Sequence, residues 1–247
     1  METLVKNLPA ELISSLQSAK RVTVLTGAGL SAESGLPTFR GDEGLWKKYK
    51  AEDLASIDGF LKRPQVIWEW YEYRRSIYAN ARPNPGHLAL VELEKFYPEF
   101  TLITQNTDGL HFAAGSESIL ELHGNIRRNR CHLCGKLYPE KVESNGQVPP
   151  RCVCGGMLRA DVVWFGEALS PSILDAAWRA ASQSELFFSI GTSALVQPAA
   201  SLSLVAKRSG AVLVEINLEP TPLSSEVDYF LEGKASDWLF LIKEALQ

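Results

Sequence analysis

A glycine-rich run directly follows a short apolar stretch near the start of the chain. The run Gly27-Ala28-Gly29-Leu30-Ser31-Ala32 comes after Val22-Thr23-Val24-Leu25. A buried strand that leads into Gly-x-Gly-x-x-Gly/Ala lets backbone N–H groups approach a pyrophosphate at the start of a helix. The run therefore predicts a dinucleotide site that includes Gly27 and Ala28, although similar turns often bind nothing.

The segment after this run differs from an ordinary dinucleotide fold. Such a fold continues with a helix, a second strand and an acidic residue about 20 positions on for the ribose. Residues 34–44 are instead rich in glycine and proline and include Arg40. We expect a long loop that covers the bound ligand.

All four cysteines lie in one short segment, as Cys131-x-x-Cys134 and Cys152-x-Cys154. We expect no secretion signal, so a metal site is favoured over disulfides, and four thiolates complete a tetrahedral zinc shell. Gly135 and Gly155-Gly156 follow the two pairs, as in the tight turns of a zinc ribbon. The spacing predicts a structural Zn2+ bound by the four cysteines, with His132 exposed. Free or paired thiols are the alternative.

The composition describes a globular chain of 247 residues, 45% hydrophobic and 22% charged, with a formal net charge of −4. A negative net charge does not favour binding to nucleic acid. The basic residues also form no patch, because they are scattered apart from Arg127-Arg128-Asn129-Arg130. No apolar run reaches the ~18 residues of a membrane helix. We therefore expect a cytoplasmic protein that binds neither nucleic acid nor membranes.

Short apolar stretches alternate with amphipathic ones along most of the chain. The stretches that read as strands are 21–26, 100–105, 161–165, 186–191 and 211–217. Those that read as helices are 9–20, 86–96, 171–182 and 198–208. Continuous apolar strands alternating with helices predict an α/β fold, a Rossmann-like parallel sheet with helices on both faces.

Two segments interrupt this alternation and predict a smaller lobe within one domain of residues 1–247. The smaller lobe comprises a helical module at about 42–80 and a zinc ribbon at about 125–159. The larger, Rossmann-like lobe comprises about 1–41, 81–124 and 160–247.

Polar residues follow three of the predicted strands. They are Gln105-Asn106-Thr107-Asp108, Gly191-Thr192-Ser193 and Asn217-Leu218-Glu219. Ligands of open parallel sheets bind beyond the carboxyl ends of the strands, so these residues are expected to converge on one edge. Each segment taken alone could also be a turn or a helix cap.

Over nearly its whole length the chain resembles the sirtuins, the NAD-dependent protein lysine deacylases. The resemblance rests on the glycine run with Pro37-Thr38-Phe39-Arg40, on Thr104-Gln105-Asn106-Thr107-Asp108-Gly109-Leu110-His111, on Glu121-Leu122-His123-Gly124, on the four cysteines, on Val162-Val163-Trp164-Phe165-Gly166-Glu167 and on Gly191-Thr192-Ser193. It implies a Rossmann-like lobe, a zinc ribbon and NAD+ as co-substrate.

The resemblance also implies the reaction. In sirtuins the acyl oxygen of a modified lysine attacks the nicotinamide ribose of NAD+, which releases nicotinamide. The acyl group then passes to the ribose, and reaction with water yields O-acyl-ADP-ribose and free lysine. This chemistry needs a base near neutral pH, and imidazole has an unperturbed pKa of ~6.5. His123 matches the family's base, with Asn106 as a second catalytic residue. For a lone histidine the competing interpretation is a helix cap or a core side chain.

The resemblance assigns NAD+ contacts along the chain. Asn106 and Asp108 would hold the ribose and the nicotinamide amide, and Gln105 would contact the ribose. The remaining expected contacts are Gly27, Ala28, Thr38, Phe39, Arg40, Gly191, Thr192, Ser193, Asn217, Glu219 and Ala235. Phe39 could shield the reactive ribose carbon from water, or serve only as a core anchor.

Acylated-lysine proteins or peptides are the implied partners. Val163, Phe165 and Gly166 match the segment that pairs with a substrate peptide as an added strand. Because main-chain bonds dominate such recognition, it tolerates many peptide sequences. Without the family, the same residues would be read as a buried strand.

One helical face carries an arginine among aromatic residues. Ile67, Tyr71, Arg74 and Tyr78 share this face, and Arg74 has no acidic residue three or four positions away. Snorkelling to water or stacking on a ring would be the ordinary roles of such an arginine.

Tyr71 and Arg74 match the Tyr-x-x-Arg pair of class III sirtuins, which in that class reads the carboxylate of succinyl-, malonyl- or glutaryl-lysine. Ala51 and Ala55 match the roomy acyl pocket of that class, and Thr38 stands where deacetylases often carry aspartate. We predict desuccinylation and demalonylation, with deacetylation retained.

Three positions depart from the family pattern. Thr107 replaces an aliphatic residue, Cys152-x-Cys154 is one residue tighter than usual, and Ala160 stands where proline is frequent. Two other functions stay open: a protein ADP-ribosyltransferase on the same scaffold, and an inactive NAD-sensing or interaction module.

Overall fold

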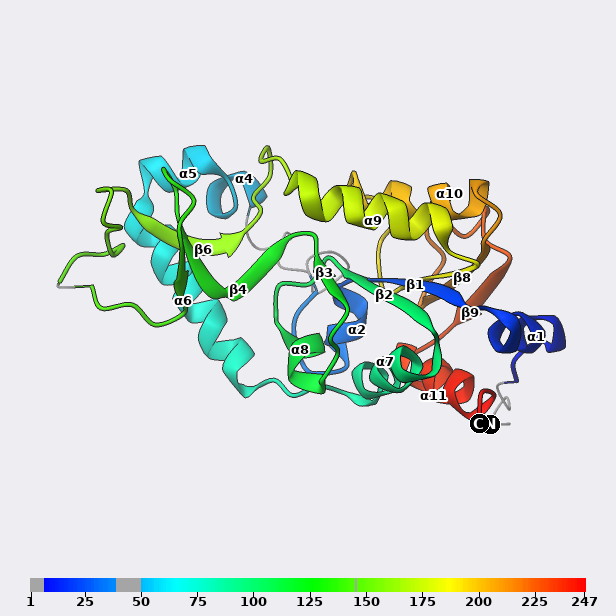
Figure 1. Cartoon of the computed structure of the whole chain (residues 1–247). Helices are drawn as coiled ribbons and strands as arrows, with labels where there is room; N and C mark the ends of the chain where they lie inside the picture. Colours follow the sequence, from blue (N-terminus) through cyan, green and yellow to red (C-terminus); the bar gives the residue numbers. More distant parts are fainter. Residues whose placement is uncertain (1–6, 39–49, 145) are drawn as a thin grey trace.

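The computed structural model describes residues 7–38, 50–144 and 146–247. Figure 1 shows a larger lobe built on a parallel sheet beside a smaller lobe that contains a second, antiparallel sheet. This arrangement confirms the predicted fold class.

The larger sheet contains six parallel strands in the order β3-β2-β1-β7-β8-β9. Its strands are β1 (Arg21–Thr26), β2 (Glu99–Thr104), β3 (Ile119–Glu121), β7 (Leu186–Ile190), β8 (Val212–Asn217) and β9 (Tyr229–Glu232). The central strands read as continuous apolar runs because helices cover both faces of the sheet.

Two sets of helices cover the sheet, as Figure 1 shows. One face packs against α1 (Ala10–Ser18), α7 (Pro85–Phe96) and α11 (Ala235–Glu244). The other packs against α9 (Pro171–Gln183) and α10 (Ala199–Arg208). Successive residues of one strand serve the two cores: Val24 faces the first and Leu25 the second.

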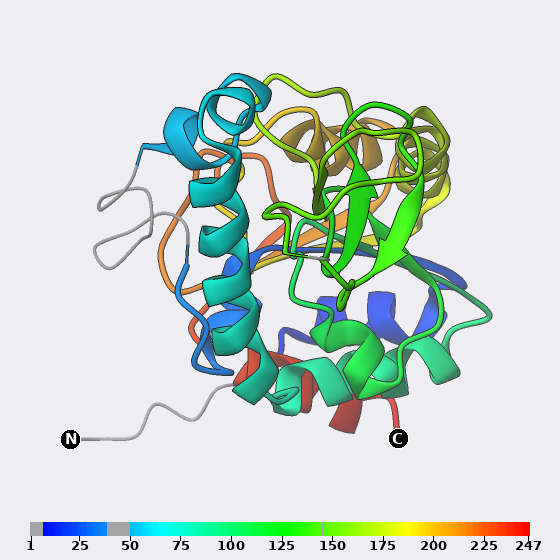
Figure 2. The same ribbon diagram turned by 90° about the vertical axis from the view of Figure 1, so that its left-hand side faces the viewer.

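The smaller lobe combines helices with a three-stranded sheet of order β5-β4-β6. Its elements are α4 (Ala51–Leu54), α5 (Ile57–Lys62), α6 (Pro64–Asn80), β4 (Gly124–Cys131), β5 (Leu137–Pro139) and β6 (Leu158–Val162). In Figure 2 this lobe faces the viewer, with α6 running alongside the antiparallel strands. Aromatic and aliphatic side chains from α5, α6 and the segment after β6 form its core.

One predicted strand is wrong in place and in partner. The apolar run 161–165 was expected to join the parallel sheet, but the strand is Leu158–Val162 and pairs antiparallel with β4. The run continues past Val162 as a turn, because the Glu167 N–H bonds to the Trp164 carbonyl and Gly166 has a φ of +84°. An apolar run alone does not distinguish the two sheets.

The other predicted strands and helices of the larger lobe are present. The short helices α2 (Ala28–Ala32) and α8 (Leu110–Ala114), the edge strands β3 and β9, and the terminal helix α11 were not anticipated. No helix in the described ranges combines the length and the apolarity that a membrane crossing requires.

Two buried histidines meet beneath the carboxyl edge of the sheet. His87 belongs to the capping box that starts α7, at the beginning of the helix predicted over 86–96. Its ring centroid lies 4.9 Å from that of His111, whose Nε2 is 2.9 Å from the Thr26 Oγ1. Burial lowers the pKa of His87 to about 4 and that of His111 to about 3.

We predict that this pair makes the fold sensitive to mild acid. Both rings are neutral when folded but take up protons below pH 6.5 when unfolded, so stability is complete above that pH and falls toward pH 4. Each ring should contribute a slope of up to about 1.4 kcal/mol per pH unit. Urea unfolding across this range measures the slope, which His87→Gln should reduce. A native stability that does not change over this range would contradict the prediction.

Candidate active site

The polar residues predicted to converge do so at the carboxyl edge of the larger sheet. Gly27 follows β1, Gln105 follows β2 and Gly191 follows β7, while Asn217 ends β8. On one side of β1 the sheet continues with β2 and β3, and on the other side it continues with β7, β8 and β9. This reversal of strand order is where doubly wound sheets form their binding crevice.

The loops after β1 and β7 are in direct backbone contact. The Gly29 N–H donates to the Gly191 carbonyl at 2.8 Å. A Cβ at Gly29 would lie 2.7 Å from the Gly191 Cα, and one at Gly27 would lie 2.6 Å from the Gly191 oxygen. These glycines therefore allow the two loops to pack together, in addition to any role in binding phosphate. The sequence pattern did not reveal this packing role.

Asn106 and Asp108 are joined through one hydroxyl. The Ser31 Oγ donates to the Asp108 Oδ2 at 2.8 Å and accepts from the Asn106 Nδ2 at 3.1 Å. The Asn106 Nδ2 also donates to the Gly27 carbonyl at 3.0 Å, and the Leu110 N–H donates to the Asp108 Oδ1 at 2.8 Å. Both predicted side chains are buried and held by the β1 loop.

Burial raises the pKa of Asp108 above its usual value. The Leu110 N–H, the Ser31 hydroxyl and the charges of Arg127 and Arg74 oppose this effect of burial. A carboxylate of this kind is a strong acceptor that is costly to leave unpaired.

His123 follows β3 and is half-buried. A hydrogen bond made by its ring holds the side chain in place. Its Nδ1 is 3.1 Å from the Gln105 carbonyl, so Nδ1 carries the hydrogen and Nε2 is left as the acceptor. Within the described residues, Nε2 makes no hydrogen bond. Burial lowers the pKa of His123, partly opposed by the Gln105 carbonyl. At neutral pH the ring is therefore an unprotonated base.

Some of the other expected NAD+ contacts are joined by hydrogen bonds, and others lie apart from them. The Gln105 Nε2 donates to the Thr192 Oγ1 at 3.1 Å, and the Asn217 Nδ2 donates to the Thr192 carbonyl at 2.8 Å. Glu219 is exposed, whereas Ala235 begins α11 in the core of the larger lobe. Thr38 is half-buried, and Phe39 and Arg40 lie outside the described residues.

Tyr71 and Arg74 are both buried in the smaller lobe, at 2% and 4% exposure. The Arg74 guanidinium lies 5.8 Å from the Tyr71 ring centroid and 5.1 Å from that of Tyr78, and it donates to the Tyr78 hydroxyl. Arg74 therefore does not snorkel to water. Burial raises the pKa of Tyr71, and the Arg74 charge opposes this effect.

The segment matched to peptide binding is tied to His123. The Val163 N–H donates to the His123 carbonyl at 3.0 Å, and the Phe165 N–H donates to the Ala55 carbonyl at 2.9 Å. Phe165 and Gly166 are exposed, and Val163 is half-buried. Ala55 is buried in the smaller-lobe core, and the side chain of Ala51 lies outside the described part of the chain.

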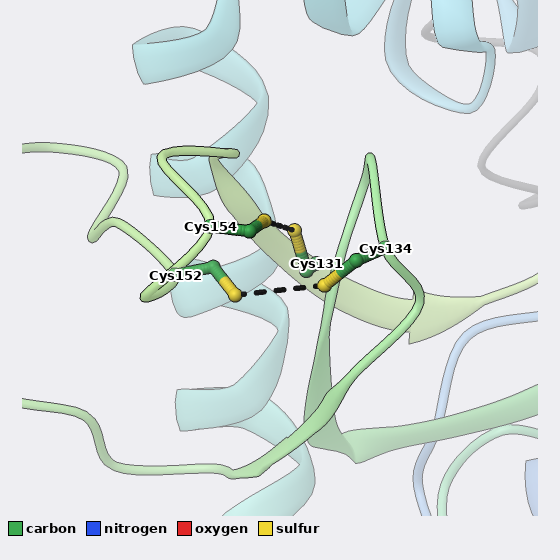
Figure 3. A group of neighbouring side chains, drawn as sticks. All are labelled: Cys131, Cys134, Cys152 and Cys154. Atoms are coloured by element: carbon green, nitrogen blue, oxygen red, sulfur yellow. Dashed lines mark hydrogen bonds between the residues drawn. The ribbon is translucent and has the colours of Figure 1, made fainter.

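The four cysteines form one cluster, which Figure 3 shows. All four sulfurs lie within 4.8 Å of one another, with 3.5 Å between Cys131 and Cys154 and 3.7 Å between Cys134 and Cys152. Sulfurs around tetrahedral Zn2+, with Zn–S near 2.3 Å, are about 3.8 Å apart. The cluster fits one structural zinc, and the tight Cys152-x-Cys154 pair does not prevent it.

The thiol environment also favours a metal. The Cys154 backbone N–H and the Tyr138 hydroxyl lower the pKa of Cys152 to about 6, which stabilises the thiolate. His132 is not exposed as expected but half-buried, because its Nδ1 accepts from the Met157 N–H at 2.9 Å and its ring contacts Phe60. The Met157 contact occupies Nδ1, one of the two ring nitrogens that could bind a metal.

We predict that Cys134→Ser lowers bound zinc from about one ion per chain to near zero and lowers the melting temperature. A chelator should do the same to the native protein. Elemental analysis and thermal unfolding measure both effects. Val153→Ser is the matched control, because Val153 lies between the second pair yet is 86% exposed. Full zinc content in Cys134→Ser would contradict the assignment.

Sequence reasoning assigned no role to Ser31, although its hydroxyl joins the two predicted polar residues. Thr104 was missed too: its Oγ1 accepts from the Asn106 N–H at 3.0 Å and from the Thr26 hydroxyl at 2.9 Å. Ser31 lies in the glycine-rich run and Thr104 begins the Thr104–His111 segment, which is the signal that the sequence offers. Their bonding depends on neighbouring strands and is invisible in one sequence.

Comparison with known proteins agrees with this geometry. The sequence pattern described as the Sir2 family matches residues 27–198. The NAD-dependent protein deacylase of Leptospira interrogans is 50% identical over 230 residues, 92% of this chain and 94% of that protein. A solved complex of a Sir2 homologue with NAD is 44% identical, with a TM-score of 0.88 over 97% of this chain and 94% of that one.

A further solved structure, a complex of Sir2 with a p53 peptide and NAD+, is 32% identical, with a TM-score of 0.86 over 95% of this chain and 97% of that one. The family pattern covers more than half of the chain, and sequence and fold relatives extend over almost all of it. This chain therefore belongs to the Sir2 family, the sirtuins.

Proposed function

We propose that this protein is an NAD-dependent protein lysine deacylase. One observation carries the proposal: the His123 ring is oriented by the main chain of Gln105, the residue next to Asn106, at the crevice edge of the sheet. An unprotonated imidazole thus lies where Asn106, Ser31 and Asp108 are already ordered. The deacylase names of close relatives support the same activity.

The residues at this edge suit NAD+. A nucleotide with ribose hydroxyls and a carboxamide needs amide, hydroxyl and carboxylate partners, and Asn106, Asp108 and Gln105 supply them. The Thr107 Oγ1 is buried without a hydrogen-bond partner among the described residues, which leaves one more polar group for a ligand. The solved NAD complexes of homologues support this assignment.

Within this proposal, NAD+ supplies the glycosidic bond that is cleaved and the ribose that accepts the acyl group. His123 takes a ribose hydroxyl proton at Nε2, because Nδ1 is committed to the Gln105 carbonyl. Asn106 and Asp108 hold the ribose and carboxamide in the orientation that the Ser31 hydroxyl sets. Preorganised donors and acceptors of this kind need no rearrangement during the reaction.

The segment after β6 would bring the acyl-lysine to this base. The Val163 N–H is bound to the His123 carbonyl, so the proposed substrate segment lies directly beside the proposed catalytic histidine. We infer that acylated-lysine peptides pair with Val163, Phe165 and Gly166, as the peptide complex of a homologue supports. A cytoplasmic location and the absence of nucleic-acid binding stay predictions.

We predict that His123→Ala lowers NAD-dependent deacylation at least about 100-fold, the usual contribution of general-base catalysis. In the native enzyme, kcat/KM should stay level through neutral pH and fall only below pH 6.5, since the pKa of His123 is lowered. Nicotinamide release and free lysine are measured against pH. An acid limb centred above pH 6.5 would contradict the assignment, and label transferred from NAD+ to the acceptor protein would favour an ADP-ribosyltransferase.

We further propose that the preferred acyl groups are succinyl and malonyl, with acetyl also accepted. Tyr71 and Arg74 support this proposal: a buried guanidinium beside a phenol hydroxyl suits an anionic acyl tip. Charge-assisted hydrogen bonds are roughly twice as strong as neutral ones, so the pair should favour an acyl carboxylate over a methyl group.

We predict that Arg74→Met lowers kcat/KM for a succinyl-lysine peptide by roughly 10- to 100-fold, the worth of a hydrogen bond to a charged group. Turnover of the acetyl version should change less than about threefold, because its methyl tip makes no such bond. The two peptides share one sequence and differ only in the acyl group. Equal loss of both activities would refute the acyl preference and leave the deacylase proposal intact.

A further inference from the structure

The Tyr71 hydroxyl is bound by an indole from the other side of the smaller lobe. Trp164 lies in the turn after β6, is 2% exposed, and its Nε1 donates to the Tyr71 oxygen at 2.7 Å. An indole N–H can only donate, so the Tyr71 oxygen is the acceptor in this bond. The direction of the bond is therefore set by chemistry and does not depend on assigned hydrogen positions.

The hydroxyl hydrogen of Tyr71 is left uncommitted by this arrangement. In residues 7–38, 50–144 and 146–247, no acceptor takes it. An ionised carboxylate offers acceptors only, whereas the groups that already surround the phenol, the Trp164 indole and the Arg74 guanidinium, offer donors only. A ligand whose tip only accepts hydrogen bonds therefore suits the Tyr71 hydroxyl and the Arg74 guanidinium.

The indole itself is held on two sides. The Arg159 guanidinium lies 4.0 Å from the Trp164 ring centroid and donates to the Val162 carbonyl at 2.9 Å. Arg159 also pairs with Glu167, whose Oε2 accepts from the main-chain N–H of Trp164 at 2.8 Å. The turn that follows β6 therefore fixes the indole relative to α6.

We propose that Trp164 is a positioning residue for acyl specificity. The indole N–H of Trp164 donates to the Tyr71 oxygen. The hydroxyl hydrogen of Tyr71 is thereby directed toward the acyl carboxylate. This inference rests on the proposed preference for acidic acyl groups and extends it beyond Tyr71 and Arg74. An acetyl group has no carboxylate tip, so its turnover does not depend on this bond.

A double-mutant cycle tests the proposal in the full chain. Trp164→Phe keeps a ring and removes the N–H, Tyr71→Phe removes the hydroxyl, and the double variant removes both. Each enzyme is assayed at saturating NAD+ with acetyl- and succinyl-lysine versions of one peptide. Trp178→Phe is the matched control, because Trp178 is a partly buried residue of α9 that packs against the core of the larger lobe.

Trp164→Phe is expected to lower the succinyl-to-acetyl ratio of kcat/KM by roughly 3- to 10-fold, the worth of one neutral hydrogen bond. The loss should come mainly through a higher KM for the succinyl peptide. In the Tyr71→Phe background, Trp164→Phe should leave the ratio unchanged, because the bond no longer exists. Trp178→Phe should not alter the ratio in either background.

An unchanged ratio in Trp164→Phe, or an equal further loss in the Tyr71→Phe background, overturns the proposal. If the phenylalanine variant does not fold, benzothienylalanine at position 164 keeps the bicyclic shape without the N–H and gives the same comparison. A lowered ratio in Arg74→Met with no change in Trp164→Phe defeats this inference alone. No change in either variant, or native enzyme without succinyl turnover, defeats the acyl preference as well.

Discussion

The close approach of two loops at the centre of the parallel sheet joins the two halves of the candidate nucleotide site. Gly27 and Gly29 after β1 meet Gly191 after β7 at distances that exclude a Cβ. The β1 loop also meets the segment after β2, because β1 pairs with β2 as well as with β7. There the Asn106 Nδ2 donates to the Gly27 carbonyl, and the Ser31 hydroxyl joins Asn106 to Asp108.

In the proposed function, the smaller lobe adds acyl selectivity to His123, the proposed base. Its core is an aromatic cluster in which Tyr71 from α6 and Trp164 from the turn after β6 are hydrogen-bonded. The same turn is bound to His123 through the Val163 N–H. One short segment thus connects His123, the proposed base, with Tyr71 of the proposed acyl-reading pair.

Local patterns predicted much of the fold. The β1 stretch has the bounds expected from its apolar run, and α7 begins at its Asn84 cap. The run at 161–165 was misplaced because a buried antiparallel strand and a buried parallel strand have the same composition. The strands β3 and β9 span only three and four residues, too few for a periodic signal.

The sequence by itself determined the chemical types: a glycine turn after a strand, one imidazole in the Glu-Leu-His-Gly setting, four thiols at metal spacing and a tyrosine with an arginine one turn later. These depend on local spacing, which a chain carries without its partners. The tertiary structure alone decided the bonding of Nδ1 in His123, the joining of Asn106 and Asp108 by Ser31, and the donation from Trp164 to Tyr71. Those contacts unite residues far apart in the chain, and their directions depend on packing between strands and lobes that no single segment encodes.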